Sequence, residues 1–163
     1  MSFEDLLANN LAYADGFADG GFDGIAKAGI AMVTCMDSRI EPLAMLGLRL
    51  GDAKILRSPG GRVSTSVLTG CVLSVQLLHV DRIMIVPHTR CAMASGTDDD
   101  IRKVIAAKTG IDTSWISFGA SPDQQARLRA DVDMVNNHPL IKGQAEVGGF
   151  MYDVDTGLLT QVI

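Results

Sequence analysis

Two short, continuously apolar segments constrain the fold of this chain more than any other feature of its sequence. They cover residues 29–34 and 82–87, and turn-forming or charged residues bound each of them. Runs of this kind are typical of parallel strands that are buried on both faces. Between them the sequence predicts a weaker strand at 54–57, a turn at Ser58-Pro59-Gly60-Gly61, and a helix from about 66 to 79 with its apolar positions on one face.

Helix signals continue this alternation toward the C-terminus. Thr97 precedes Asp98–Asp100, so a cap residue and three carboxylates begin a helix that Gly110 is placed to end. Ser121-Pro122-Asp123 combines a cap residue with a proline at the first helical position. A second helix is therefore predicted from there to a point before Pro139.

The two ends of the chain complete the predicted architecture. Residues 147–154 and 158–163, with turn residues between them, predict a C-terminal strand hairpin. Residues 1–15 are predicted to form a helical arm, and the glycine-rich segment 16–29 would let this arm pack on a neighbouring subunit. The order of elements predicts an α/β fold with a mainly parallel central sheet flanked by helices. At this length, residues 1–163 are expected to form a single domain.

Charge and cysteine content exclude several classes of protein. The chain has 14 Lys and Arg against 19 Asp and Glu, a net charge of -5, and no dense basic run, so nucleic acids and membrane surfaces are poor partners. Its first residues are acidic where a secretory signal is basic, and no long apolar stretch follows them. We therefore expect a cytoplasmic protein whose 3 cysteines are packing groups, metal ligands or nucleophiles, not a disulfide framework.

Two thiols and an imidazole follow the predicted buried strands. Cys35 comes directly after the first strand, and His88 and Cys91 follow the second. Ligands of open α/β sheets bind outside the carboxyl ends of the strands, so these side chains can meet if the two strands are neighbours. Two sulfur donors and one nitrogen donor suit Zn2+. Three ligands leave one position for a water, whose pKa zinc lowers toward about 7. Cys71, on the apolar face of a predicted helix, is expected to be a packing residue.

Asp37 and Arg39 follow Cys35 at intervals of two residues. A nearby guanidinium keeps a carboxylate ionised through its charge and through paired hydrogen bonds. An ionised Asp37 can accept a hydrogen bond from a metal-bound water, or it can occupy the open coordination position itself and close the site. The third interpretation is an ordinary surface ion pair.

The combined pattern, Cys35-x-Asp37-x-Arg39 followed by His88-x-x-Cys91, resembles the active-site signature of the β-class carbonic anhydrases. The resemblance covers most of the chain, including the acidic N-terminal helix, and is greatest to the small bacterial and archaeal branch. It implies that Cys35, His88 and Cys91 bind one zinc ion. It also implies that Asp37 accepts a hydrogen bond from zinc-bound hydroxide and that Arg39 pairs with Asp37.

The same resemblance implies an activity and an assembly. The activity is the reversible hydration of carbon dioxide to bicarbonate and a proton, and the assembly is a homodimer or a dimer of dimers in which N-terminal helices reach across to the partner. Two departures leave the substrate open: Ser58-Pro59-Gly60 stands where many members have Asn-Ala-Gly, and Ala92 stands where glycine is usual.

Two other functions follow from these departures and from the open role of Asp37. Enzymes that hydrolyse carbonyl sulfide or carbon disulfide have the same fold and ligand set, so such a hydrolase is the alternative. A non-catalytic zinc-binding or redox-sensing module, closed by Asp37, is a further interpretation. Arg39 disfavours it, because the ion pair engages Asp37 away from the metal.

Overall fold

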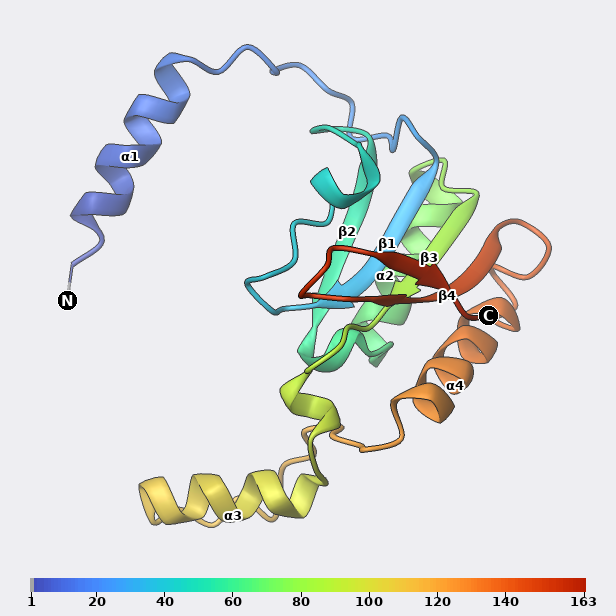
Figure 1. Ribbon diagram of the computed structural model, residues 1–163. Coiled ribbons are helices and arrows are strands. Elements are labelled where there is room, and N and C mark those ends of the chain that lie inside the picture. The colour runs from blue at the N-terminus through green and yellow to red at the C-terminus, as the bar shows by residue number, and fades with distance from the viewer. Residues whose placement is uncertain (1) are drawn as a thin grey trace.

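A five-stranded sheet forms the centre of the protein, whose computed structural model describes residues 2–163. In chain order its strands are β1 (Ile30–Cys35), β2 (Ala53–Ser58), β3 (Arg82–Val86), β4 (Glu146–Tyr152) and β5 (Leu159–Gln161). The strand order across the sheet is β2-β1-β3-β4-β5 (Figure 1). β5 runs antiparallel to β4, and the other neighbouring pairs are parallel. The predicted α/β fold with a mainly parallel sheet and a C-terminal hairpin is confirmed.

The described residues form four α-helices, of which α1 precedes β1 and the other three lie in connections between strands. These are α1 (Glu4–Asp15), α2 (Thr65–Leu77), α3 (Asp98–Thr109) and α4 (Gln124–Asn136). Single 3-10 turns follow β1, β2 and β3, namely η1 (Ala44–Leu46), η2 (Pro59–Gly61) and η3 (Ala92–Ala94). None of the helices within residues 2–163 has the length and apolar character needed to cross a membrane.

The two faces of the sheet are covered by different parts of the chain. α2 contacts β1 and β2, and α4 contacts β3 and β4. Both helices enclose one core with Ala31, Val33, Ile83 and Ile85 of the strands, and Cys71 is fully buried in it, as predicted. A second core on the opposite face contains Met32, Ile40, Val86 and Tyr152, with partly buried residues of η1 and β5. Because both faces are covered, every residue of β1 is buried.

Local signals position α3 as the sequence predicts. The Thr97 hydroxyl accepts a hydrogen bond from the Asp100 backbone N–H, and the Asp100 carboxylate accepts one from the Thr97 backbone N–H. These two bonds form a capping box, which satisfies donors that the first turn leaves free. Gly110 ends the helix in the left-handed conformation, with φ of 72°.

The predicted start of α4 is wrong by two residues. Asp123, and not Ser121, caps the helix, and its side chain accepts a hydrogen bond from the Ala126 backbone N–H at 2.9 Å. The Ser121 backbone N–H instead donates to the Met93 carbonyl at 2.9 Å. Ser121 is therefore held to η3 by a long-range contact, and the helix begins after Asp123, the second of the two candidate cap residues.

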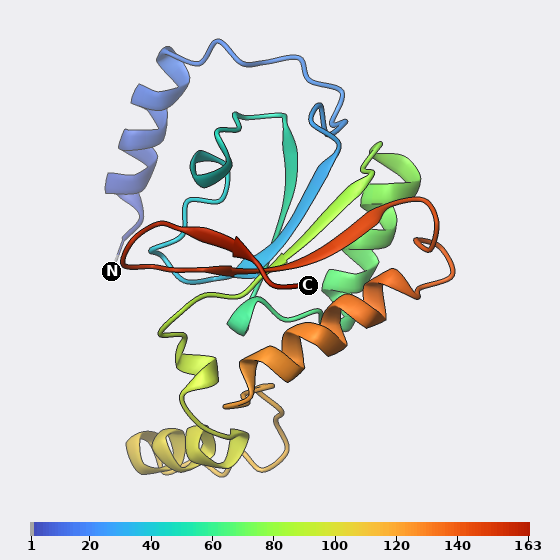
Figure 2. The same cartoon turned by 45° about the vertical axis from the view of Figure 1, so that its right-hand side comes forward.

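α1 stands away from the sheet, at the end of a long connection (Figures 1 and 2). None of its residues is buried. Large apolar side chains of α1 and its flanks are exposed, namely Phe3, Leu6, Leu7, Leu11, Tyr13 and Phe17. An isolated helix of this length is marginal in water.

Gly61 provides a test of how tightly η2 packs under the end of β1. Its φ is 67°, and an added Cβ would lie 3.2 Å from the Cys35 backbone nitrogen and 3.3 Å from the Val86 carbonyl oxygen. Gly110 has a similar φ of 72° but no atom within 4 Å of such a Cβ. We expect Gly110→Ala to cost about 1–2 kcal/mol through backbone conformation alone. Gly61→Ala should cost about 1–3 kcal/mol more, because packed backbone must move.

Urea unfolding of both variants and the wild-type protein measures the difference. Equal losses of unfolding free energy for the two variants would contradict the close packing described here.

Candidate metal centre

The side chains of Cys35, His88 and Cys91 converge at the carboxyl ends of two neighbouring strands. β1 pairs with β3 in parallel, and Thr34 lies opposite Val86. Cys35 is the last residue of β1, and His88 lies two residues beyond the end of β3. One ligand atom from each of Cys35, His88 and Cys91 lies within 4.8 Å of the others. The three side chains are buried, and none of the cysteines is in a disulfide.

The orientation of His88 leaves one ring nitrogen without a protein partner. Its Nδ1 lies 2.8 Å from the Thr89 carbonyl oxygen, which makes Nδ1 the protonated donor. Its Nε2 is buried and has no hydrogen-bond partner within residues 2–163. A metal-binding histidine is commonly fixed in this way, with the second ring nitrogen donating to a carbonyl oxygen. The free Nε2 lone pair faces the two thiols.

The loop between the two candidate ligands is held to the C-terminal hairpin. The Thr89 backbone N–H donates to the Tyr152 carbonyl at 2.9 Å, and the Val154 backbone N–H donates to the Thr89 hydroxyl at 3.1 Å. Arg90 has a φ of 53°, in the left-handed region that residues with a side chain seldom adopt. Its guanidinium pairs with Asp155 at 2.7 Å. These contacts fix a sharp bend that brings His88 and Cys91 together.

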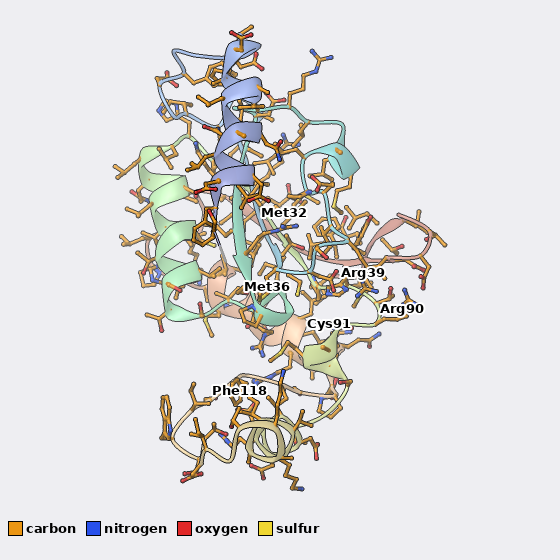
Figure 3. The ribbon with its side chains drawn as sticks, turned by 90° about the vertical axis from the view of Figure 1, so that its left-hand side faces the viewer. Met32, Met36, Arg39, Arg90, Cys91 and Phe118 are labelled. Carbon is orange, nitrogen blue, oxygen red and sulfur yellow. The ribbon has the colours of Figure 1, made fainter. Side chains whose placement is uncertain are left out.

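Asp37 and Arg39 form a two-point ion pair beside the cluster. Arg39 Nε and Nη2 donate to the two carboxylate oxygens of Asp37 at 2.9 and 2.7 Å, and the Arg39 backbone N–H adds a third bond at 3.0 Å. These bonds from Arg39 hold the pKa of Asp37 well below its usual range. Asp37 Oδ2 lies 3.7 Å from His88 Nε2, which is too long for a hydrogen bond. Arg39 and Cys91 occupy the same region of the molecule, together with Arg90 (Figure 3).

The two thiols of the cluster share a proton. A hydrogen bond with Cys91 lowers the pKa of Cys35 to about 5, against the raising effect of its burial. The same interaction raises the pKa of Cys91 above its ordinary value. Cys71, by contrast, has its pKa raised to about 11 by burial alone among apolar groups. The cluster therefore favours one thiolate at neutral pH even without a cation.

The cluster fits a tetrahedral metal ion in donor type and spacing. Zinc–sulfur distances near 2.3 Å and zinc–nitrogen distances near 2.0 Å place tetrahedral ligand atoms about 3.5–3.8 Å apart. That spacing is compatible with ligand atoms that lie within 4.8 Å of one another. The partnerless Nε2 of His88 is a second sign of fit, since a buried nitrogen lone pair costs free energy unless something binds it. Asp37 stays outside this set of three.

The sequence departures lie close to the cluster. Ser58 is opposite Cys35 in the β1–β2 register, and its hydroxyl donates to the Arg62 carbonyl at 2.7 Å. Gly60 is buried against Met93, whereas Ala92 is exposed directly after Cys91. His79 and His138 lie outside the cluster, and Asp98–Asp100 form the first turn of α3.

Sequence reasoning missed three residues that shape this centre. Arg90 and Asp155 form the ion pair of the bent loop, and Gln124 Nε2 donates to the His88 carbonyl at 3.0 Å. The partner of Gln124 lies 36 residues away along the chain. The pairing of Arg90 with Asp155 depends on the bend of the loop. No local pattern marks such contacts, although the position of Arg90 between two candidate ligands could have drawn attention to it.

Comparison with known proteins matches this sequence and fold. The family profile of carbonic anhydrase matches residues 30–159. β-Carbonic anhydrase 1 of Mycobacterium tuberculosis is 35% identical over 159 residues, which cover 98% of this chain and 96% of that protein. A crystal structure of carbonic anhydrase from Streptococcus mutans superposes with a TM-score of 0.90 at 34% identity, covering 100% of this chain and 99% of that one.

A second group of relatives bears the name of a different enzyme. Carbon disulfide hydrolase of Saccharolobus solfataricus is 29% identical over 150 residues, which cover 77% of this chain and 72% of that protein. The more similar full-length relatives are the carbonic anhydrases. This chain belongs to the β-carbonic anhydrase family.

The shared proton of the thiol pair generates a pH prediction for metal-free protein. In a Cys71→Ser background, we expect one thiolate per chain to form with a midpoint near pH 5, as the pKa of Cys35 requires. Because this pKa lies below the value of about 9 for an unfolded thiol, folding is favoured when Cys35 is ionised. The unfolding free energy should therefore rise from pH 5 to pH 9 and be lost as the pH falls through this window.

Ultraviolet absorbance of the thiolate, followed during pH titration after chelation, measures the first effect, and urea unfolding at several pH values measures the second. Cys91→Ala removes the hydrogen-bond partner and should return the Cys35 midpoint toward its ordinary value. If no thiolate forms below about pH 8, the ordinary range for a free thiol, the shared-proton interpretation is wrong.

Proposed function

We propose that this protein catalyses the reversible hydration of carbon dioxide to bicarbonate and a proton, with one zinc ion held by Cys35, His88 and Cys91. The observation that carries the proposal is the buried three-ligand cluster with the free Nε2 of His88, placed beside a carboxylate that Arg39 keeps away from it. Zinc bound there supplies the Lewis acidity that makes a water nucleophilic near neutral pH.

The chain's own residues orient the attacking water. Asp37 stays ionised and can only accept hydrogen bonds, so it accepts one from the O–H of that water and thereby turns a lone pair of the water oxygen toward the substrate carbon. Arg39 fixes both oxygens of Asp37 and thereby the direction from which it accepts. The proton released in the reaction passes to solvent or buffer.

The geometry of Asp37 also favours an enzyme over a closed binding module. Closing the fourth position would require Asp37 to give up bonds of 2.9 and 2.7 Å to Arg39. Charge-assisted, two-point bonds of this kind are the stronger class of hydrogen bond. An accessible fourth position is what a hydration reaction needs.

A hydrolase that acts on carbonyl sulfide or carbon disulfide is the second candidate. Ser58-Pro59 and Ala92 border the cluster, and the relatives named carbon disulfide hydrolase lend support to this alternative. These substrates are linear and are attacked at carbon like carbon dioxide. Sulfide release, measured beside carbon dioxide hydration on the same zinc-loaded protein, separates the two activities. A hydration rate far above the rate of sulfide release favours the carbonic anhydrase.

Asp37→Asn tests the proposed mechanism. Asparagine keeps the shape of the side chain but loses the ionised acceptor, so we expect hydration at neutral pH to fall by at least about 100-fold. Stopped-flow hydration measures the rate, and metal analysis shows whether the variant still holds zinc. Asp99→Asn is the matched control, because Asp99 forms an arginine pair of the same 2.7 Å length, with Arg102 on α3.

Full activity in Asp37→Asn with zinc retained would contradict the role proposed for Asp37. An absence of hydration in the zinc-loaded wild-type protein would contradict the proposed function as a whole. Retained zinc with no activity in either assay would support the non-catalytic binding module.

We further propose that residues 1–163 form one catalytic domain that assembles as a homodimer, or as a dimer of dimers, through the arm at residues 1–15. The exposed apolar side chains of α1 support this assembly, since Leu7 is 64% and Leu11 72% exposed. Each leucine that becomes buried contributes about 1.5–3 kcal/mol to association. In a symmetric dimer, each copy of the chain provides the surface on which the arm of the other copy packs.

Leu7→Glu combined with Leu11→Glu should shift the protein from dimer toward monomer, because charges would enter the contact. Sedimentation velocity measures the mass. Val104→Glu on α3 is the control, since Val104 is 68% exposed on a helix of the same length. A wild-type protein that sediments as a monomer, or a double variant that still dimerises, would contradict the role of the arm.

A further inference from the structure

A small cavity, partly open to the surface, lies between β3, η3 and α4, next to one of the candidate metal ligands. Its volume is about 20 Å³. Cys91 and Met93 line one side, and Leu128 and Asp131 of α4 line another. Cys35, Asp37, Arg39 and His88 are absent from its lining, so the cavity does not include the ion pair of the metal centre.

One of the two arginines in the cavity wall is fully paired. Arg62 Nε and Nη2 donate to the two oxygens of Asp131 at 2.5 and 2.9 Å. The Val63 backbone N–H adds a third bond to Asp131 at 3.2 Å. Asp131 is only 1% exposed, and both of its carboxylate oxygens are bonded to Arg62.

The other arginine, Arg127, has no acidic partner within 4.0 Å among residues 2–163. Its Nε is buried and makes no hydrogen bond there. Carboxylates stand four residues away on either side, but Asp123 caps α4 through the Ala126 N–H and Asp131 is held by Arg62. The wall of the cavity thus carries two guanidiniums against one carboxylate. A buried donor on a charged group costs free energy when it is left unpaired.

We propose that this cavity is a binding site for one small monovalent anion of about the size of chloride, held by Arg127. A single negative charge neutralises the excess of one guanidinium. The volume of about 20 Å³ accommodates one particle of roughly water size. Ser121 and Arg127 both line the cavity, so the chain also offers a hydroxyl donor to the anion.

The position of the cavity connects the anion to the metal-binding loop. Cys91 forms part of the wall, and Gln124 in the same wall donates to the His88 carbonyl at 3.0 Å. An anion bound by Arg127 therefore lies in the same cavity as Cys91 and as Gln124, which holds the His88 carbonyl. Its binding does not depend on which substrate the enzyme hydrates.

Crystals grown with bromide in place of chloride test the site directly, through the anomalous scattering of bromine. We expect a peak within hydrogen-bond distance of Arg127 Nε. Thermal unfolding in solution tests the affinity: replacing gluconate by chloride at constant ionic strength should raise the Tm by on the order of 3 °C, because chloride binds the folded state only. Arg127→Gln should abolish this shift. Arg129→Gln, at an exposed arginine of the same helix, should retain it.

Three results would overturn the proposal. The first is a water without anomalous signal in the cavity, and the second is a bromide peak with no chloride-specific shift in solution, which marks an adventitious ion only. The third is an equal chloride shift in Arg127→Gln and the wild-type protein. If Arg127→Gln fails to fold, the bromide crystals and the wild-type chloride series decide the question. Both readouts are independent of hydration activity.

Discussion

The parallel pairing of β1 with β3 is the constraint on which the metal centre depends. Thr34 lies opposite Val86, so the two strands end side by side and deliver Cys35 and His88 to the same edge of the sheet. Side chains alternate between faces along a strand, and a slip of one residue would turn one of the two groups away from the other. The apolar residues of β1 and β3, buried on both faces, fix this register because any slip would move them out of their cores.

The contrast among three arginines shows how placement decides the role of one type of side chain. Arg39 is partly exposed and controls a single carboxylate, Asp37, whose direction matters to the proposed chemistry. Arg62 is partly buried and ties the loop after β2 to α4 through Asp131. Arg127 belongs to the same helix as Asp131 but has no protein counter-charge within residues 2–163. An arginine can therefore orient a carboxylate, hold two elements together or remain free to bind an anion. The carboxylates within its reach decide which of these it does.

Local patterns in the sequence predicted the features that depend on a few adjacent residues. Thr97 and Gly110 bound α3 as expected, because caps and left-handed stops are decided within one turn of helix. The strand ends that carry Cys35 and His88 were predicted from two apolar runs, and the structure brings those side chains together. The start of α4 was misplaced because Ser121 is held by Met93, a contact that no local pattern encodes. The pair of Arg62 with Asp131 was not predicted, since 69 residues separate its members.

The left-handed backbone of Arg90 has a consequence for how a metal ion enters the centre. Small zinc modules fold around their ion, so that uptake and folding are one event. Here the bend between His88 and Cys91 is held by the hydrogen bonds of Thr89 to the hairpin and by the Arg90–Asp155 pair, none of which uses a candidate ligand atom. The bend and the sheet beneath it therefore have supports that do not pass through a metal ion. Loss of an ion from this centre would remove only the contacts of the three ligand atoms, so metal uptake and folding need not be one event.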